Sequence, residues 1–178
     1  MAGILQVEQI QGPTSGANAN TITIPAGQTL TVADGLPIDA MPAGANLQMV
    51  QQQFTTYENV TSTSFTDTLV SISITTTRDN SKILYTGNIG WNPSAGRYIS
   101  YRLLRNGTAI YTPGRISPDA EGGEDSEHMG FIGFLDTPNV DAGTTVTYLL
   151  QMLSQQNLGG VRINDNLKSN VILQEIAG

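Results

Sequence analysis

The sequence contains no cysteine, one histidine and one tryptophan, and only 13% of its 178 residues are charged. Without cysteine the chain forms no disulfides and performs no thiol chemistry, and the usual zinc-binding motifs are missing. Its eight lysines and arginines are scattered singly between Arg78 and Lys168, and the chain has a net charge of -7. Nucleic-acid binding needs clustered basic residues, so we expect no direct contact with DNA or RNA.

Long hydrophobic runs are absent as well. The first twelve residues, MAGILQVEQIQG, include neither a basic region nor an apolar run of signal length. No later stretch reaches the roughly 18 apolar residues that a membrane-spanning helix needs. We therefore expect a chain made in the cytoplasm, without a Sec-type signal or membrane partner, that would leave a cell by lysis.

Residues 21–44, TITIPAGQTLTVADGLPIDAMPAG, form three short units, each closed by a glycine turn. Within the units apolar residues alternate with threonines, the period expected of a strand with one buried face. Strands of four residues bury too little surface to offset the roughly 1 to 2 kcal/mol per residue of backbone entropy that ordering costs. The missing surface must come from elsewhere in the chain or from other chains.

A self-associating stalk supplies that surface most simply, with three chains presenting their apolar faces to a common axis. The predicted trimer-interface residues are Ile22, Ile24, Leu30, Val32 and Ile38. The alternative is an extended edge segment that packs along the chain's own main domain. Before the units lies a possible short strand, Ile4 to Ile10, followed by a loop rich in Gly, Pro, Ser and Asn. We expect this arm to contact a neighbour through Ile4, Leu5, Val7 and Ile10.

From Asn46 onward longer strands are separated by turn clusters at intervals of ten to fifteen residues, which is typical of a sandwich or barrel. The expected strands cover residues 47–54, 65–75, 82–91, 97–105, 108–112, 127–136, 144–153, 160–164 and 170–176. Eight or nine antiparallel strands predict an all-β, jelly-roll-like sandwich. The predicted organisation is an arm and stalk in residues 1–45 and a β-sandwich head in residues 46–178.

The pattern also predicts the core and two local features. Inward faces are expected at Val70, Ile72 and Ile74, at Ile83, Tyr85, Ile89 and Trp91, and at Val146, Tyr148, Leu150 and Met152. Asn106-Gly107 lies between two alternating runs and predicts a type I′ hairpin, because both central positions need positive φ. The glycines at 87, 90, 130 and 133 lie inside strands and indicate bulges or close backbone approaches.

The one dense cluster of charge is the acidic stretch of residues 119–127. Its carboxylates belong to Asp119, Glu121, Glu124, Asp125 and Glu127. Hard cations such as Ca²⁺ prefer several carboxylate oxygens, but the spacing is not that of an EF-hand. A solvated loop, a Ca²⁺ site and a contact with a basic patch on a partner are three readings of this stretch.

Catalytic chemistry has little support. His128, the sole histidine, would need a nucleophile and an orienting acid such as Asp125 or Glu127. Two carboxylates would suffice for a glycosidase, yet Trp91 is the one tryptophan available for an aromatic-lined groove. We expect a non-enzymatic protein with no cofactor, Ca²⁺ being the one ion left open.

Motifs along nearly the whole chain resemble virion surface proteins of tailed bacteriophages, most closely those infecting cyanobacteria and other aquatic bacteria. The residues that carry the resemblance are ILQVEQIQ, TITIPAGQTLTVADG, SFTDTLVSISITTTRDNSKILY, YRLLRNGTAIY, FLDTP and NVILQEIA. The resemblance implies a trimer-forming N-terminal part and a jelly-roll head, found in tail-fibre tips, head fibres and capsid decoration (cement) proteins. It transfers no catalytic residue.

The short N-terminal part favours a capsid decoration or head-fibre role over a tail fibre, which generally needs an adaptor domain and a long shaft. The expected partners are further copies of the chain and the major capsid protein, at the virion surface. The alternatives are a tail component that binds a host surface glycan and an enzyme that acts on host polymer.

Overall fold

The structure is a computed structural model that describes residue 26 and the ranges 38–93, 98–116, 128–154 and 160–178. By its internal contacts the chain divides into two units, Met1–Leu36 and Pro37–Gly178. We call the second unit the head, and all elements described below belong to it. No helix in these ranges is long and apolar enough to cross a membrane.

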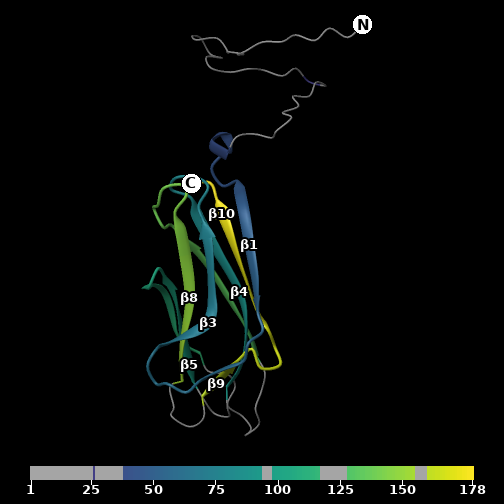
Figure 1. The fold of residues 1–178 in the computed structure, drawn as a ribbon, viewed down its shortest axis with the longest axis vertical. Coiled ribbons are helices and arrows are strands. Elements are labelled where there is room, and N and C mark those ends of the chain that lie inside the picture. Colours follow the sequence, from purple (N-terminus) through teal and green to yellow (C-terminus); the bar gives the residue numbers. More distant parts are fainter. Residues whose placement is uncertain (1–25, 27–37, 94–97, 117–127, 155–159) are drawn as a thin grey trace. The chain divides into compact units, whose positions relative to one another are not determined.

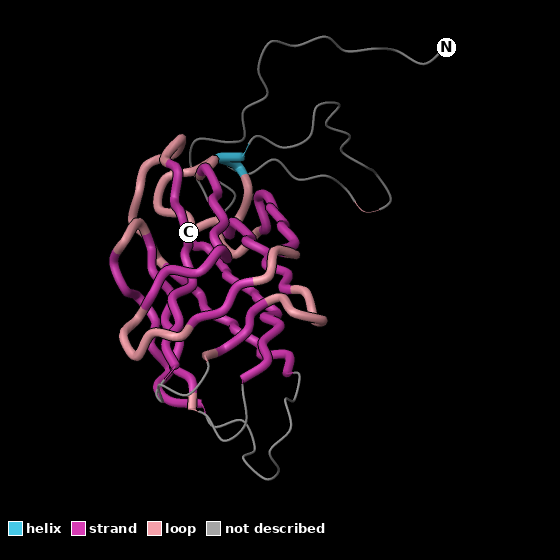
Figure 2. The backbone as a smooth tube through the Cα atoms, turned by 60° about the horizontal axis from the view of Figure 1, so that its bottom comes forward, coloured by secondary structure: helices cyan, strands magenta, loops and turns pink. Residues whose placement is uncertain are grey.

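The head consists of strands, with one short 3₁₀ helix at its start (Figure 2). The elements in chain order are η1 (Ile38–Ala40), β1 (Asn46–Phe54), β2 (Glu58–Val60), β3 (Thr66–Thr75), β4 (Lys82–Pro93), β5 (Ile99–Arg105), β6 (Thr108–Ile116), β7 (His128–Asp136), β8 (Thr145–Ser154), β9 (Val161–Ile163) and β10 (Ser169–Ile176). The expected all-β class is confirmed.

The strands form two antiparallel sheets, which face each other (Figure 1). In the first, sheet A, the order is β1-β10-β4-β7, and the short strands β2 and β9 continue the lines of β1 and β10. In the second, sheet B, the order is β3-β8-β5-β6. Each sheet is therefore four strands wide.

The connections give this sandwich its topology. The chain passes from one sheet to the other between β2 and β3, β3 and β4, β4 and β5, β6 and β7, β7 and β8, and β8 and β9. The β5–β6 hairpin is the one connection between neighbouring strands of the same sheet. Eight strand lines in two sheets with these crossings make a jelly roll, as the sequence pattern predicted.

Alternation of apolar and polar residues explains the core. The predicted inward residues of β3, β4 and β8 are all buried, with Ile83, Val146, Tyr148 and Leu150 fully inaccessible. The ring of Tyr85 packs against that of Tyr148 with centroids 6.0 Å apart, so the two sheets meet through aromatic as well as aliphatic side chains.

The predicted turn is confirmed, and of the four strand glycines Gly90 makes the predicted close approach to another backbone. Asn106 and Gly107 have φ values of 47° and 84°, as a type I′ turn requires. A Cβ atom on Gly130 would overlap the ring of Trp91, and one on Gly90 would overlap the backbone of Leu167. The glycines at these two positions let an indole and a loop lie directly against the sheet.

The last strand, β10, is central in sheet A. It pairs with β1 along one edge and with β4 along the other. Its inward positions include Val171 and Leu173, both fully buried, and also the buried carboxylate of Glu175.

Candidate interaction surfaces

Most of the residues that the sequence marked as functional lie outside the described ranges. These are the predicted contact residues Ile4, Leu5, Val7 and Ile10, the predicted stalk residues Ile22, Ile24, Leu30 and Val32, and the acidic residues Asp119, Glu121, Glu124, Asp125 and Glu127. Ile38 is described: it begins η1 and is 39% exposed. Its predicted trimer contact stays a prediction.

The chain enters the head at the end where β1 begins and β10 finishes, which we call the junction end. The amide of Gly44 donates to the carbonyl of Ala177 at 2.8 Å, and the amide of Ala177 donates to the carbonyl of Ala45 at 2.8 Å. Arg78 Nη1 donates to the carbonyl of Met41 at 2.7 Å. Residues 41–45 are thereby fixed to the sandwich.

Glu175 organises this end from within. Its carboxylate accepts hydrogen bonds from Gln48 Nε2 at 2.6 Å, the Thr77 amide at 2.8 Å, Thr77 Oγ1 at 2.9 Å and the Arg78 amide at 3.2 Å. Burial acts to raise the pKa of Glu175, but the hydrogen bonds from Gln48, Ser81 and Thr77 outweigh it and hold the pKa below its usual value. One anion thus joins β1, β10 and the β3–β4 turn.

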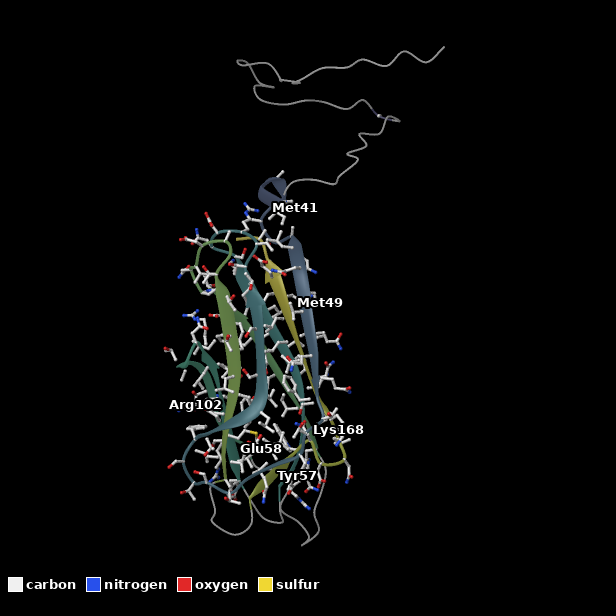
Figure 3. The ribbon with its side chains drawn as sticks, viewed as in Figure 1. Met41, Met49, Tyr57, Glu58, Arg102 and Lys168 are labelled. Atoms are coloured by element: carbon white, nitrogen blue, oxygen red, sulfur yellow. The ribbon has the colours of Figure 1, made fainter. Side chains whose placement is uncertain are left out.

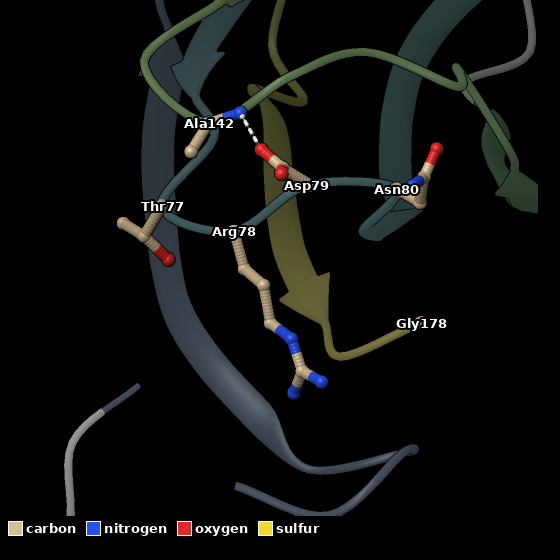
Figure 4. Close-up of a pocket in the computed structure, with 6 residues that line it drawn as sticks. All are labelled: Thr77, Arg78, Asp79, Asn80, Ala142 and Gly178. Carbon is tan, nitrogen blue, oxygen red and sulfur yellow. Dashed lines mark hydrogen bonds between the residues drawn. The ribbon is translucent and has the colours of Figure 1, made fainter. Parts of the chain in front are cut away.

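A pocket of about 690 Å³ opens beside this turn (Figure 4). Its lining residues are Thr77, Arg78, Asp79, Asn80, Ala142 and Gly178. The Asp79 side chain turns towards Ala142 and accepts its amide hydrogen at 2.8 Å, while the Arg78 side chain extends away from them. The side chains of Arg78 and Asp79 therefore each hydrogen-bond a backbone group. Among the lining residues named above, we find no group of charged side chains that point together into the pocket to bind a ligand.

The opposite end of the head, the distal end, collects the ends of other strands. Strand register places Trp91 beside His128, Ile99 beside both Ile116 and Ser154, and Pro93 beside Val161. The connections after β4, β6 and β8 all leave from this end. If the chain binds a receptor, the sequence predicts that two exposed loops, residues 92–97 and 113–127, carry the specificity. In the structure residues 92–93 belong to β4 and residues 113–116 to β6, and the rest of both segments lies outside the described ranges.

The outer face of sheet A carries almost no charge. Its outward positions alternate with the core positions along each strand. They are Met49, Gln51 and Gln53 on β1; Asn170, Ile172, Gln174 and Ile176 on β10; Lys82, Leu84, Thr86 and Asn88 on β4; and Met129, Phe131, Gly133 and Leu135 on β7. Lys82 is the one charged residue among these, and the short strand β9 adds the outward Arg162. The most exposed large hydrophobic side chains of this face are Met49, Met129, Phe131 and Leu135.

Hydrogen bonds between polar side chains are more numerous on the outer face of sheet B than on that of sheet A, where Gln51 Nε2 donates to Asn170 Oδ1 at 3.1 Å. Ser73 and Thr147 hydroxyls lie 2.7 Å apart, and Thr75 and Thr145 hydroxyls 2.9 Å apart. Further along, Arg102 Nε donates to Gln151 at 2.6 Å. Figure 3 labels Met49 and Arg102, which come from the two different sheets. An exposed apolar face beside a face with paired polar groups marks sheet A as the candidate interaction surface.

Neither catalysis nor metal binding finds support in the described geometry. Within the described ranges no group of three or more His, Cys, Asp and Glu side chains could hold a metal ion. His128 lies at the start of β7, half-buried and paired with Trp91, while its suggested acidic partners are outside those ranges. The three readings of the acidic stretch, a solvated loop, a Ca²⁺ site and a partner contact, are not tested, because its residues lie outside the described ranges.

Sequence inspection missed three features that the fold creates. They are the Glu175 cluster, the ion pair between Arg105 and Asp136 at 2.8 Å, and the outer edge of β7, with which no described strand pairs. Glu175 did leave a signal, since it shares its parity with Val171 and Leu173. The other two depend on which strands become neighbours, and no local pattern reveals that.

Comparison with known proteins gives little beyond these observations. No family model and no curated protein matches the chain. Similar solved structures include the VP2 subviral particle of infectious bursal disease virus, with 14% identity, a TM-score of 0.44, and coverage of 93% of this chain and 41% of that one. Another is dimeric latent PorU from Porphyromonas gingivalis, with 10% identity, a TM-score of 0.44, and coverage of 89% and 15%.

A third is the Gx strain of the same virus, with 8% identity, a TM-score of 0.42, and coverage of 81% and 36%. The chain thus spans less than half the length of each of these solved chains. TM-scores and identities this low carry no conclusion about its function.

Proposed function

We propose that the chain is a non-enzymatic structural protein of a tailed-bacteriophage virion. Its role is that of a capsid decoration (cement) or head-fibre protein, which binds the assembled shell as a homotrimer. The observation that carries the proposal is the division of the chain into a separate N-terminal unit and a jelly-roll head. The phage proteins that the sequence resembles combine a trimer-forming N-terminal part with such a head.

The junction end supports this division of labour. Residues 41–45 are held to the sandwich by backbone hydrogen bonds, so the N-terminal unit is joined to the head through an anchored segment. The loops of the distal end leave from the other end of the strands. One end is available for attachment while the other is available for display.

As a cement protein, each trimer sits where neighbouring capsomers meet and holds them together against the pressure of packaged DNA. Because it binds only the assembled shell, it stabilises the shell by mass action. Threefold symmetry in the protein matches a local threefold axis of the shell. The N-terminal arm with Ile4, Leu5, Val7 and Ile10 makes the shell contact in this mechanism.

Imaging of the purified virion, with quantification of this chain against the major capsid protein, tests the proposal. Hundreds of copies over the shell are expected. Deletion of residues 1–12 should abolish binding to expanded capsids while leaving the head folded. Normal binding by that deletion variant would remove the arm from the contact.

The trimer has its own test in the stalk. Ile24→Asp combined with Val32→Asp places charges on the predicted apolar faces, so the product should be monomeric or insoluble. Sedimentation equilibrium measures the mass. An unchanged trimer would show that these units do not form the interface.

A receptor-binding tail protein is the second candidate, favoured by the gathering of loop-bearing strand ends at the distal end. In that case a dozen or so copies should lie at the tail. Soluble protein should then label host cells through a surface glycan and compete with infection, which a decoration protein need not do.

A further inference from the structure

Strand β7 is an edge strand whose residues between its two ends, Met129 to Leu135, include no charged residue and no proline to protect the edge. Among the described strands only β4 pairs with it, and their register is unbroken from Ile83 opposite Asp136 to Trp91 opposite His128. Edge strands are normally guarded by lysine, proline, a bulge or short length. β7 has nine residues, HMGFIGFLD, without lysine or proline. Its outer edge is therefore open to pairing with another strand.

The side chains along this edge are exposed in a pattern that suits pairing. Phe131 is 66% exposed, and Met129 and Leu135 are each 50% exposed, all on the outer face of sheet A. Gly133 lies between Phe131 and Leu135, and the ring of Phe131 lies close to it, since a Cβ atom on Gly133 would be 3.0 Å from Phe131 Cε1. The patch is apolar, linear and parallel to the open backbone edge.

The sequence of β7 is complementary to itself when two copies run antiparallel about Ile132. Met129 then faces Leu135 of the second copy, and Phe131 faces Gly133. On the inner side Gly130 faces Phe134, and Ile132 faces its own counterpart. In this register each phenylalanine lies opposite a glycine of the second copy.

Charge agrees with this register. The two ionisable residues of β7 are His128 and Asp136, at opposite ends of the strand. Antiparallel pairing about Ile132 places the histidine of one copy beside the aspartate of the other, so no like charges meet. For a chain of net charge -7, an edge without repelling charges is where a second copy can approach most closely.

We propose that β7 pairs with β7 of a second copy around a two-fold axis through Ile132, which joins two copies of sheet A into one continuous sheet. The contact is isologous, as a two-fold interface must be. The pairing follows from β7 alone. Its use, the linking of neighbouring trimers across the shell, rests on the proposed function.

Disulfide trapping in the full-length chain tests the register. The natural sequence has no cysteine, so Met129→Cys combined with Leu135→Cys introduces the only thiols. Directly opposite residues in an antiparallel pair have Cβ atoms about 4.5 to 5.5 Å apart, which brings a disulfide within reach. Within one copy the two sites are six residues apart on an extended strand, too far for an internal bond. Mild oxidation should therefore yield covalent dimers on a denaturing, non-reducing gel.

The matched control is Met49→Cys with Leu135→Cys. Met49 lies on the same outer face with similar exposure, but on β1 at the opposite edge of sheet A. This variant should stay uncrosslinked, because its position 135 faces methionine in the second copy. Both variants are checked for wild-type circular dichroism and melting before oxidation.

Absence of covalent dimer in the folded Met129→Cys and Leu135→Cys variant would overturn the proposal, as would equal cross-linking in the control. If the N-terminal unit or another protein covers β7, no covalent dimer will form. A second variant, Phe131→Lys, should abolish the doubled-mass species in sedimentation velocity while leaving the melting temperature close to that of the wild type. Neither result bears on where the protein sits in the virion, so failure of the pairing leaves the proposed function standing.

Discussion

Glu175 places a carboxylate on the core-facing side of β10, where the other alternate positions are occupied by the apolar residues Val171 and Leu173. It is fully buried, so its charge is stable only because donors surround it. Those donors come from β1 and from the β3–β4 turn. Loss of this single charge would therefore loosen three segments of the junction end at once.

We predict that Glu175→Gln lowers the free energy of unfolding at pH 7 by about 2 kcal/mol, because a neutral amide replaces an anion that accepts several hydrogen bonds. The folded-state pKa of Glu175 lies below its ordinary value of 4.5. Its stabilisation is thus complete above the unfolded-state pKa and is lost as the pH falls through the folded-state pKa. The wild type should lose stability through this acid range, and the variant should lose less.

Urea unfolding at pH 7 and at several values below 4.5 measures both effects. Glu58→Gln is the control, since Glu58 is also a strand glutamate and accepts the amide of Leu69 at 2.8 Å, but lies at the surface. It should change stability by less than about 1 kcal/mol. Equal losses in the two variants, or an unchanged acid profile for Glu175→Gln, would contradict the assigned role.

At the scale of elements, the two sheets are tied by a polar contact as well as by the core. Arg105 Nη1 of β5 binds both carboxylate oxygens of Asp136 of β7, at 2.8 and 3.0 Å. The hydroxyl of Tyr148 on β8 donates to the same carboxylate at 2.7 Å. Burial, followed by this hydrogen bond to Asp136, raises the pKa of Tyr148, so the phenol stays protonated and keeps donating.

We predict that Arg105→Ala lowers the free energy of unfolding by about 3 kcal/mol, because Asp136 is left as a buried charge without its cation. Arg102→Ala on the same strand should cost about 1 kcal/mol or less, since Arg102 binds Gln151 on the outer face of sheet B. Chemical denaturation of both variants gives the comparison. Similar small losses would mean that the ion pair does not join the sheets.

Strand positions were predictable from the sequence to within a residue or two, because most strands have one buried face and alternate strictly. β3, β4 and β8 illustrate this, as does β10 with its buried inner positions. β2 was missed, since three residues are too few to show a period. β6 was expected to end at residue 112 but continues to Ile116, through Pro113 and Gly114, where the apolar pattern stops.

Strand order and the candidate surfaces were beyond local patterns. Periodicity identifies the two faces of β7. It does not show that β4 pairs with one edge and no described strand with the other, because that depends on strand order. In the same way, the sequence shows only that Asp136 is a polar residue at a strand end. Its contacts with Arg105 and Tyr148 arise from strand order, which local patterns do not reveal. Apart from Ile38, the expected residues of the arm, stalk and acidic loop lie outside the described ranges, and the roles of all of them stay predictions.

At the scale of the whole molecule, two associations would act through separate parts of the chain. The stalk would join three copies through residues before the head, and β7 would join two copies through the head itself. The head is a compact unit from Pro37 onward, and its described core residues all lie after that point in the sequence. Removal of the N-terminal unit should therefore separate the two associations.

We predict that a chain lacking residues 1–36 folds with a melting temperature close to that of the full chain, no longer forms trimers, and still pairs through β7 at high concentration. A chain lacking residues 1–45 should be less stable by about 2 to 3 kcal/mol, because it loses three hydrogen bonds worth about 1 kcal/mol each. They join Met41 to Arg78, Gly44 to Ala177 and Ala45 to Ala177.

Calorimetry and sedimentation velocity on the two truncations give the measurement, with Phe131→Lys in the shorter deletion as the control for pairing. If the chain lacking residues 1–36 fails to fold, the N-terminal unit completes the head, as an edge segment packed on its own domain would. If it folds but remains trimeric, the threefold contact lies in the head. The stalk would then serve only to attach the protein to the shell, and contacts between heads rather than between stalks would link neighbouring capsomers.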